Sequence, residues 1–392
     1  MRRALFCCAA AAVFACGPTA PAASNNSPTI ASASPSPSPS PSPAALPVEV
    51  LSIIFLNGYE TVDLVTISNG IATDRHLLDK QPVSVLDANQ RIALITNNNG
   101  TQLATLDLDS GAIRGLGVNS PGGLGPGVLS PDGTRAAVAA RRADLVSHEI
   151  LIVDLASSTA RPLLELSASA YNRAGLDPIR WTNAGILVSP GVWDGGRSTL
   201  LKLDPQSANL TTVTDAPVDV LSPGATMMAA VGYAQLGDGP YQGQGGWPNR
   251  LMAGPVGPAL GVIAEQKNRD FSAFDIADDG TVLYLADDAP FNGTGIGLND
   301  ATPAPDMGMY LATGGQSIHE FGETHVGQWG AGALVGPGMG LLTKVITQGA
   351  AGVAEIDLVN LCLMSGCNAS MQPVITVSGA YPEPRLMLLR PV

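Results

Sequence analysis

The chain has 392 residues and a formal net charge of −13, so its surface repels nucleic acid and anionic lipid headgroups. Only 14% of the residues are charged, whereas glycine (45) and proline (31) are abundant, which excludes a mainly helical protein and favours short strands joined by turns. Because 45% of the residues are hydrophobic, the chain can build a large core, and the low charge does not indicate global disorder.

Residues 1–15 have the pattern of an export signal. Met1-Arg2-Arg3 is positively charged, and the apolar stretch that follows is too short to span a bilayer. It ends in Val13-Phe14-Ala15-Cys16, which resembles the lipobox of bacterial lipoproteins, although Phe14 stands where a smaller residue is usual. The resemblance implies that Cys16 is lipidated and anchors an exported chain to the bacterial membrane, facing the periplasm or the cell exterior. An ordinary signal peptide is the alternative.

Residues 16–47 form a low-complexity segment with repeated Ser-Pro pairs between Ser34 and Pro43. Such a segment cannot bury a core and favours an extended polyproline II conformation. Directly after a lipidated cysteine it would serve as a stalk, so the lipid is the only membrane contact that we expect. Removal of Arg2 and Arg3 with the signal takes the formal charge from −13 to −15.

Residues 48–392 repeat one structural unit, which is clearest in its third copy. Leu-Ser-Pro-Asp-Gly (129–133) is a turn sequence: proline presets φ, aspartate can bond its own backbone and glycine accepts a positive φ. Strands are predicted before this turn and at Arg135–Ala140, Ile150–Leu155 and Ala160–Leu166. The strand Ile150–Leu155 is apolar on both faces, so both of its faces must be covered. In a β-propeller, neighbouring sheets supply that cover.

The other units follow the same order of strands and turns with decreasing clarity. We assign them to residues 48–78, 83–116, 178–214, 218–265, 271–321 and 330–377. The first unit has three strands, and Arg385–Leu389 could supply the fourth, closing the ring with strands from both termini. The fold class is therefore all-β, a single β-propeller for which we predict seven blades, with six or eight blades as alternatives.

The Ser-Pro-Asp-Gly turn followed by Ile-Leu-Ile-Val-Asp-Leu resembles the repeat of TolB-type propellers. The propeller domains of prolyl-oligopeptidase-like enzymes share this repeat. The resemblance implies the fold from about Pro47 onward. TolB carries an α/β domain before its propeller, which has no counterpart here, so its role in envelope assembly is not implied. A peptidase would need a Gly-x-Ser-x-Gly elbow and a hydrolase domain, and the sequence contains neither.

Cys362 and Cys367 are five positions apart, and in an exported chain this spacing indicates a local disulfide. A metal site at these cysteines would need further ligands nearby.

Other polar motifs favour structural roles. His319, Phe321, Glu323 and His325 would share one face of an extended strand and could hold a metal, but an exposed, polar outer strand that runs into a loop is the favoured explanation. Asp107-Leu108-Asp109-Ser110-Gly111 resembles the start of a calcium loop, yet the closing glutamate is missing, which favours a turn. Asp278-Asp279 is also interpreted as a turn, and Asp287-Asp288 ends a strand beside a loop. We therefore predict no metal, cofactor or catalytic residue.

The links between second and third strands all open on one side of a propeller. They are short at residues 57–60, 97–101 and 347–352, and long at 141–149, 190–198, 234–249 and 287–307. The long links carry Trp193, Asp194, Tyr241, Trp247 and Phe291, which are the predicted binding residues because aromatic side chains in long loops are typical of contact surfaces. Drift of surface loops is the alternative. Trp181 and Trp329 fall in first strands and are predicted to pack near the central channel.

The sequence favours an exported, anchored lipoprotein whose propeller binds an envelope protein or a glycan as a monomer. The alternative is a propeller hydrolase, similar to lactonases, with a metal in the central channel. A purely structural envelope component with no small ligand is a third alternative, and it predicts the same sequence features as the binding protein. We therefore expect a binding protein more than an enzyme.

Overall fold

The structure is a computed structural model, which describes residues 51–57, 61–68, 71–79, 83–97, 100–167, 175–190, 199–215, 218–232, 249–257, 259–266, 269–288, 308–322, 329–347, 352–364, 367–379 and 384–389. The predicted signal peptide, Cys16 and the stalk lie outside these residues. Within them, no helix is long and apolar enough to cross a membrane.

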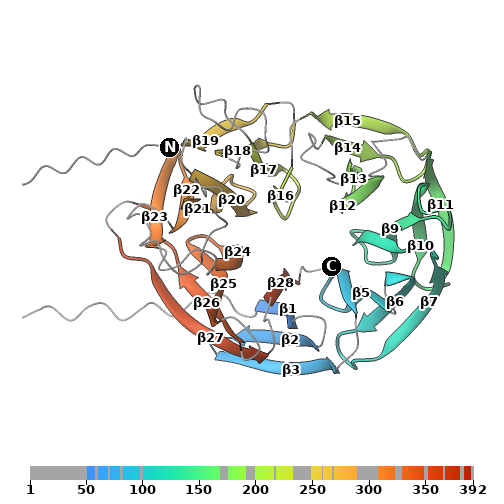
Figure 1. Ribbon diagram of the computed structural model, residues 1–392, viewed down its shortest axis with the longest axis horizontal. Coiled ribbons are helices and arrows are strands. Elements are labelled where there is room, and N and C mark those ends of the chain that lie inside the picture. Colours follow the sequence, from blue (N-terminus) through green and yellow to red (C-terminus); the bar gives the residue numbers. More distant parts are fainter. Residues whose placement is uncertain are drawn as a thin grey trace, which may run out of the picture. The chain divides into compact units, whose positions relative to one another are not determined.

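The described strands pair into seven four-stranded antiparallel sheets, called blades 1 to 7 in chain order, which follow one another around a ring (Figure 1). Each blade corresponds to one predicted unit. Blade 2 consists of β4 (Ser84–Ala88), β5 (Ile92–Asn97), β6 (Gln102–Asp107) and β7 (Ile113–Asn119). Blade 3 consists of β8 (Leu124–Leu129), β9 (Arg135–Arg141), β10 (His148–Asp154) and β11 (Thr159–Leu166). Blade 4 consists of β12 (Leu176–Thr182), β13 (Gly185–Pro190), β14 (Leu200–Leu203) and β15 (Leu210–Thr214).

Blades 5 to 7 repeat this order, with the first strand of each blade innermost and the fourth outermost (Figure 1). Blade 5 consists of β16 (Val220–Leu221), β17 (Met227–Gly232), β18 (Arg250–Pro255) and β19 (Gly261–Glu265). Blade 6 consists of β20 (Arg269–Ile276), β21 (Val282–Asp288), β22 (Gly308–Thr313) and β23 (Gln316–Gly322). Blade 7 consists of β24 (Trp329–Gly336), β25 (Met339–Thr347), β26 (Gly352–Asn360) and β27 (Ser370–Gly379).

Blade 1 combines both ends of the chain, as the sequence predicts. Its strands are β28 (Pro384–Leu388), β1 (Leu51–Asn57), β2 (Thr61–Ser68) and β3 (Ile71–Asp79), in that order from the inside. β28 pairs antiparallel with β1 from Ile53↔Leu388 to Asn57↔Pro384. This pairing joins the last described strand to the first and closes the ring without leaving β1 as a sheet edge.

Seven hydrophobic clusters, one at each seam between neighbouring blades, hold the described strands together. In β9, alternate residues face opposite neighbours: Ala136 and Val138 pack toward blade 2, whereas Ala137 packs toward blade 4. This alternation explains why Ile150–Leu155 is apolar on both faces. Trp181 is a packing residue, as predicted; it lies in the cluster between blades 3 and 4, and Arg135 lies over its ring at 5.2 Å.

Two details differ from the predicted strands. The innermost strand of blade 5 has two residues, Val220 and Leu221, where the sequence suggested a run from Val218. On β23, His319 and Phe321 lie on opposite faces: His319 stacks on Tyr310 at 4.8 Å, while Phe321 packs in the cluster toward blade 7. The cause is a register shift, since Met309 pairs with Phe321 and Tyr310 with His319, so one extra residue changes the face. The predicted shared face is therefore wrong.

Candidate functional site

Three charged residues occupy matching positions on innermost strands of alternate blades. Asp87 of β4 pairs with Leu94, Arg180 of β12 pairs with Leu187, and Asp275 of β20 pairs with Leu283. Each of them follows a β-bulge directly, and bulges re-aim the side chains beside them. The propeller thus places a carboxylate, a guanidinium and a carboxylate on the inner strands of blades 2, 4 and 6.

Asp87 and Asp275 each join their blade to the next one. Asp87 accepts hydrogen bonds from its neighbour Ala88 N at 2.9 Å and from Leu129 N of blade 3 at 2.7 Å. Asp275 accepts in the same way from Ile276 N at 2.9 Å and from Leu334 N of blade 7 at 2.7 Å. Both oxygens of each carboxylate are therefore engaged by backbone N–H groups.

Burial dominates the ionisation of these carboxyl groups. It raises the pKa of Asp275 to about 6, and the N–H groups of Leu334 and Ile276 offset part of this shift. Burial also raises the pKa of Asp87. Arg180 donates a hydrogen bond, 3.5 Å long, to Pro223 O of blade 5. Burial lowers the pKa of its guanidinium, and the negative charges of Asp87, Asp275 and Asp278 offset part of this shift.

The link between β9 and β10 is the one long second-to-third-strand link that lies largely within the described residues. Asp144 organises it by accepting hydrogen bonds from Val146 N (3.0 Å), Ser147 N (2.8 Å) and Ser147 Oγ (2.6 Å). These bonds lower the pKa of Asp144 to about 2. Arg142 bonds Glu149 at its base, at 3.1 Å.

The tip of this link exposes apolar side chains to solvent. Leu145 is 60% exposed and Val146 is 40% exposed. Leu145 also has a φ of 61°, which is uncommon for a bulky residue and is maintained here by the surrounding hydrogen bonds. We call Arg142–Ser147 the rim loop. It is an ordered polar frame that presents two apolar side chains on the face where the other long links begin.

The predicted binding residues Trp193, Asp194, Tyr241, Trp247 and Phe291 lie outside the described residues. Asp287 and Asp288 end β21 as predicted, and nothing is described of their side chains. Leu145 and Val146 of the rim loop were not predicted, because the predicted contact surface rested on aromatic residues. Two adjacent aliphatic residues inside a polar link were the available signal.

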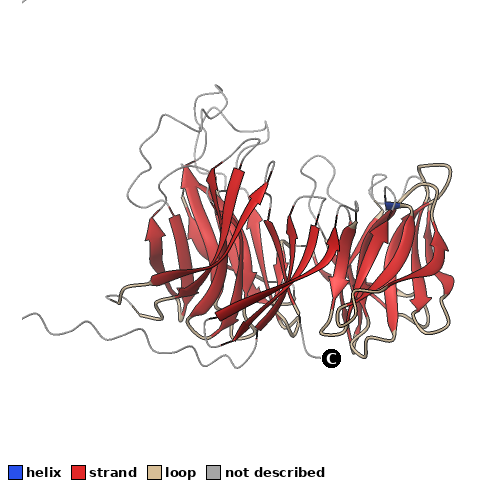
Figure 2. Cartoon of the chain, turned by 90° about the horizontal axis from the view of Figure 1, so that it is seen from below, coloured by secondary structure: helices blue, strands red, loops and turns tan. Residues whose placement is uncertain are grey.

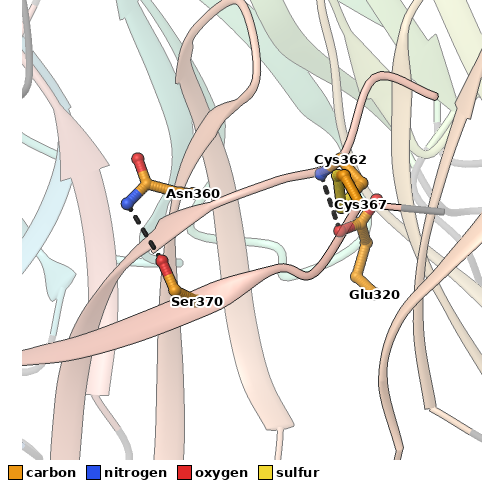
Figure 3. The surroundings of a disulfide bond; sticks show 5 residues. All are labelled: Glu320, Asn360, Cys362, Cys367 and Ser370. Atoms are coloured by element: carbon orange, nitrogen blue, oxygen red, sulfur yellow. Dashed lines mark hydrogen bonds between the residues drawn. A yellow bond between two sulfur atoms is a disulfide. The ribbon is translucent and has the colours of Figure 1, made fainter. Parts of the chain in front are cut away.

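Cys362 and Cys367 form the predicted disulfide in the link between β26 and β27 (Figure 3). Cys362 N donates a 2.8 Å hydrogen bond to Glu320 of blade 6, so the closed loop is also fixed to the neighbouring blade. Leu363 (48% exposed) and Met364 (68% exposed) lie within the loop. The asparagine at the end of β26 bonds β27 through Asn360 Nδ2 and Ser370 Oγ at 3.1 Å.

The remaining polar motifs have structural partners. Asp107 accepts hydrogen bonds from Ser110 N at 2.7 Å and Ser110 Oγ at 2.6 Å, which is the predicted turn. Asp278 belongs to a turn as predicted, but its carboxylate also reaches blade 5, which the sequence did not indicate. Among the described residues, no group of three His, Cys, Asp or Glu side chains could hold a metal ion.

An all-β ring of four-stranded blades, closed by strands from both ends of the chain, defines a β-propeller (Figures 1 and 2). No protein-family model and no curated protein matches the chain.

Several solved structures are similar to this propeller. TolB from Acinetobacter baumannii is 12% identical, with 86% of this chain and 66% of TolB covered at a TM-score of 0.43. An acylaminoacyl peptidase in complex with Z-Gly-Gly-Phe-chloromethyl ketone is 10% identical, with 83% and 51% covered at a TM-score of 0.49. Oligogalacturonate lyase in complex with manganese is 11% identical, with 82% and 83% covered at a TM-score of 0.47. The chain thus spans 66% of TolB and about half (51%) of the peptidase.

Proposed function

We propose that this chain is an exported, lipid-anchored binding protein, whose propeller holds an envelope protein or a glycan on the face that carries the rim loop. The observation that carries this proposal is the rim loop itself. Its frame is fixed by Asp144 and by the Arg142–Glu149 ion pair, while Leu145 and Val146 face solvent. An apolar tip held in one conformation loses little conformational entropy when a partner covers it.

Its position supports the same proposal. Strands alternate in direction, so the ends of β13, β17 and β21 that lead into residues 191–198, 233–248 and 289–307 lie on the same face as the rim loop. The predicted aromatic residues belong to these three links. A contact surface built from them would extend over blades 3 to 6.

The inner-strand carboxylates favour binding over hydrolysis. A metal-dependent propeller hydrolase would use carboxylates at the inner ends of several blades. Asp87 and Asp275 stand at such positions, but each already uses both oxygens to accept backbone N–H groups that join neighbouring blades. Both carboxylates thus have a structural role in joining blades, which accounts for their positions without a metal.

The test is capture of the partner by cross-linking the full chain in intact cells. Changing Leu145 and Val146 together to Ser should abolish the cross-linked product. The matched control changes Ile113 and Val262 to Ser, because these residues are 40% and 54% exposed but lie on the outermost strands β7 and β19. Equal loss in both variants, or in neither, would contradict the proposal.

The anchor is tested separately at Cys16. With Cys16→Ser the chain should move from the membrane fraction to the soluble exported fraction, because the lipid is its proposed membrane contact. A variant that stays with the membrane would contradict the lipid anchor and leave the rim-loop test unaffected.

A further inference from the structure

Two blades contain the same turn between their first and second strands. In blade 3 the turn is Ser130-Pro131-Asp132-Gly133-Thr134, and in blade 5 it is Ser222-Pro223-Gly224-Ala225-Thr226. The fourth residue donates to the first carbonyl at 2.8 Å in both turns, through Gly133 N and Ala225 N. That residue also has a positive φ in both, 66° at Gly133 and 52° at Ala225.

The two turns differ in where their carboxylate comes from. In blade 3, Asp132 accepts from Ser130 Oγ at 2.5 Å, from Thr134 N at 3.1 Å and from Thr134 Oγ1 at 2.9 Å. In blade 5 the equivalent residue is Gly224, which has no carboxylate. The matching serine and threonine would then be left without this acceptor.

A carboxylate from the next blade takes this position. Asp278 Oδ1 of blade 6 accepts from Ser222 Oγ at 2.5 Å, from Thr226 Oγ1 at 2.9 Å and from Gly224 N at 2.9 Å. These hydrogen bonds, that from Ser222 foremost, lower the pKa of Asp278. A Cβ atom on Gly224 would come within 2.8 Å of Asp278 Oδ1, so glycine is the residue that admits the neighbour's carboxylate.

The adjacent residue Asp279 shows that this contact is specific to Asp278. Asp279 Oδ1 accepts from Thr281 N of its own turn at 2.9 Å. Arg180 reaches the same blade 5 turn from the other side, since its guanidinium donates to Pro223 O. The turn therefore contacts a cation from blade 4 and an anion from blade 6.

We propose that the turn Ser222–Thr226 is a carboxylate-binding site whose resident ligand is Asp278, and that this pairing fixes blade 5 to blade 6. Two hydroxyl donors and one backbone N–H converge on Asp278 Oδ1, and the same N–H of Gly224 also reaches Oδ2 at 3.1 Å, an arrangement that suits a carboxylate. Blade 5 depends on this contact because its innermost strand has only two residues, Val220 and Leu221.

Three variants of the full chain test the assignment by thermal unfolding. Asp278→Ala should lower the melting temperature by roughly 3 °C, since the buried hydroxyl of Ser222 and the exposed donors of Gly224 and Thr226 lose their acceptor. The matched control Asp279→Ala should lower it by less, because it removes one local bond. Adding Gly224→Asp to Asp278→Ala should restore the melting temperature, because it places a carboxylate where blade 3 has Asp132.

Acetate then tests the site as a binding site. In the Asp278→Ala variant, sodium acetate should raise the melting temperature to a plateau that sodium chloride of equal ionic strength does not produce. The wild type and the Gly224→Asp/Asp278→Ala variant should not respond, because their sites are filled. Equal effects of Asp278→Ala and Asp279→Ala, or failure of both the second-site change and acetate to restore stability, would overturn the proposal.

Discussion

At the scale of single residues, equivalent positions carry different side chains, and each of them forms hydrogen bonds that join neighbouring blades or complete a turn. Asp87 and Asp275 join neighbouring blades by accepting backbone N–H groups, whereas Arg180 joins its neighbour by donating to a carbonyl. Asp132 and Asp278 complete the same kind of turn, one from within the turn and one from the next blade. The geometry of a position thus determines which polar group it needs, and several residues can supply it.

Ala225 gives a prediction at this scale, because it adopts the positive φ that glycine adopts at Gly133. Ala225→Gly should stabilise the chain by up to about 1 kcal/mol, as relief of left-handed strain exceeds the added entropy of the unfolded state. Urea unfolding measures the change. The same substitution in an extended strand, Ala137→Gly, should destabilise by about 1 kcal/mol, and a loss of stability in both variants would contradict the interpretation.

The raised pKa of Asp275 predicts that the stability of the chain depends on pH. Its pKa is raised from 3.8 to about 6, so between these values the folded state binds a proton that the unfolded state does not. The contribution of this group to the free energy of unfolding is greatest below pH 4. It falls by roughly 3 kcal/mol as the pH rises through 6.

Asp275→Asn should therefore reduce the fall in melting temperature between pH 4 and pH 6. Asp132→Asn is the control: the pKa of Asp132 is lowered to about 2, and its contribution disappears only as pH falls below this window. An unchanged pH profile in Asp275→Asn would show that other groups cause the fall.

At the scale of strands and turns, the sequence predicts most elements because their signals are local. Ser-Pro-Asp-Gly marks a turn, and a run such as Ile150–Leu155 marks a strand covered on both faces. The two-residue β16 and the bulge at Glu320 depend on packing between blades, so no local pattern shows them.

The candidate site was less predictable than the strands for the same reason. The partner of Asp87 is 42 positions away, at Leu129 N, and the partner of Asp278 is 56 positions away, at Ser222 Oγ. Whether two residues so far apart in the sequence meet depends on the lengths of all the strands and links between them. The long links were recognised from the sequence, but which side chains project from the rim loop depends on the hydrogen bonds of Asp144.

The link between β26 and β27 carries a prediction about the disulfide. Replacing Cys362 and Cys367 together by Ala should destabilise the chain by at most about 2 kcal/mol, because the bond closes a very short loop. Hydrogen exchange should rise at Cys362 N and neighbouring amides, where Glu320 fixes the loop, and not in blades 2 and 3. Unchanged exchange in this link would show that the disulfide does not hold the loop in place.

At the scale of the whole molecule, stability depends on closure of the ring. A chain ending at Glu383 lacks β28, so the edge of β1 loses its partner and Leu389 leaves the cluster between blades 1 and 2. We expect this truncation to aggregate or unfold well below the melting temperature of the full chain. A chain ending at Leu389 keeps β28 and should behave as the full chain, and equal stability of the two truncations would contradict a closing role for β28.

The place of β1 in blade 1 also has a mechanical consequence. β1 is the second strand of its blade, so its first residue, Leu51, lies on the face opposite the rim loop. A tether pulling at that end, against a partner held on the rim, would apply force along the axis of β1. The strand pairs with β28 on one side and β2 on the other, so the hydrogen bonds of both ladders would bear the tension together in shear instead of peeling one by one. If the chain is anchored and binds a partner as proposed above, the pairing of β1 on both sides would resist the pull between anchor and partner.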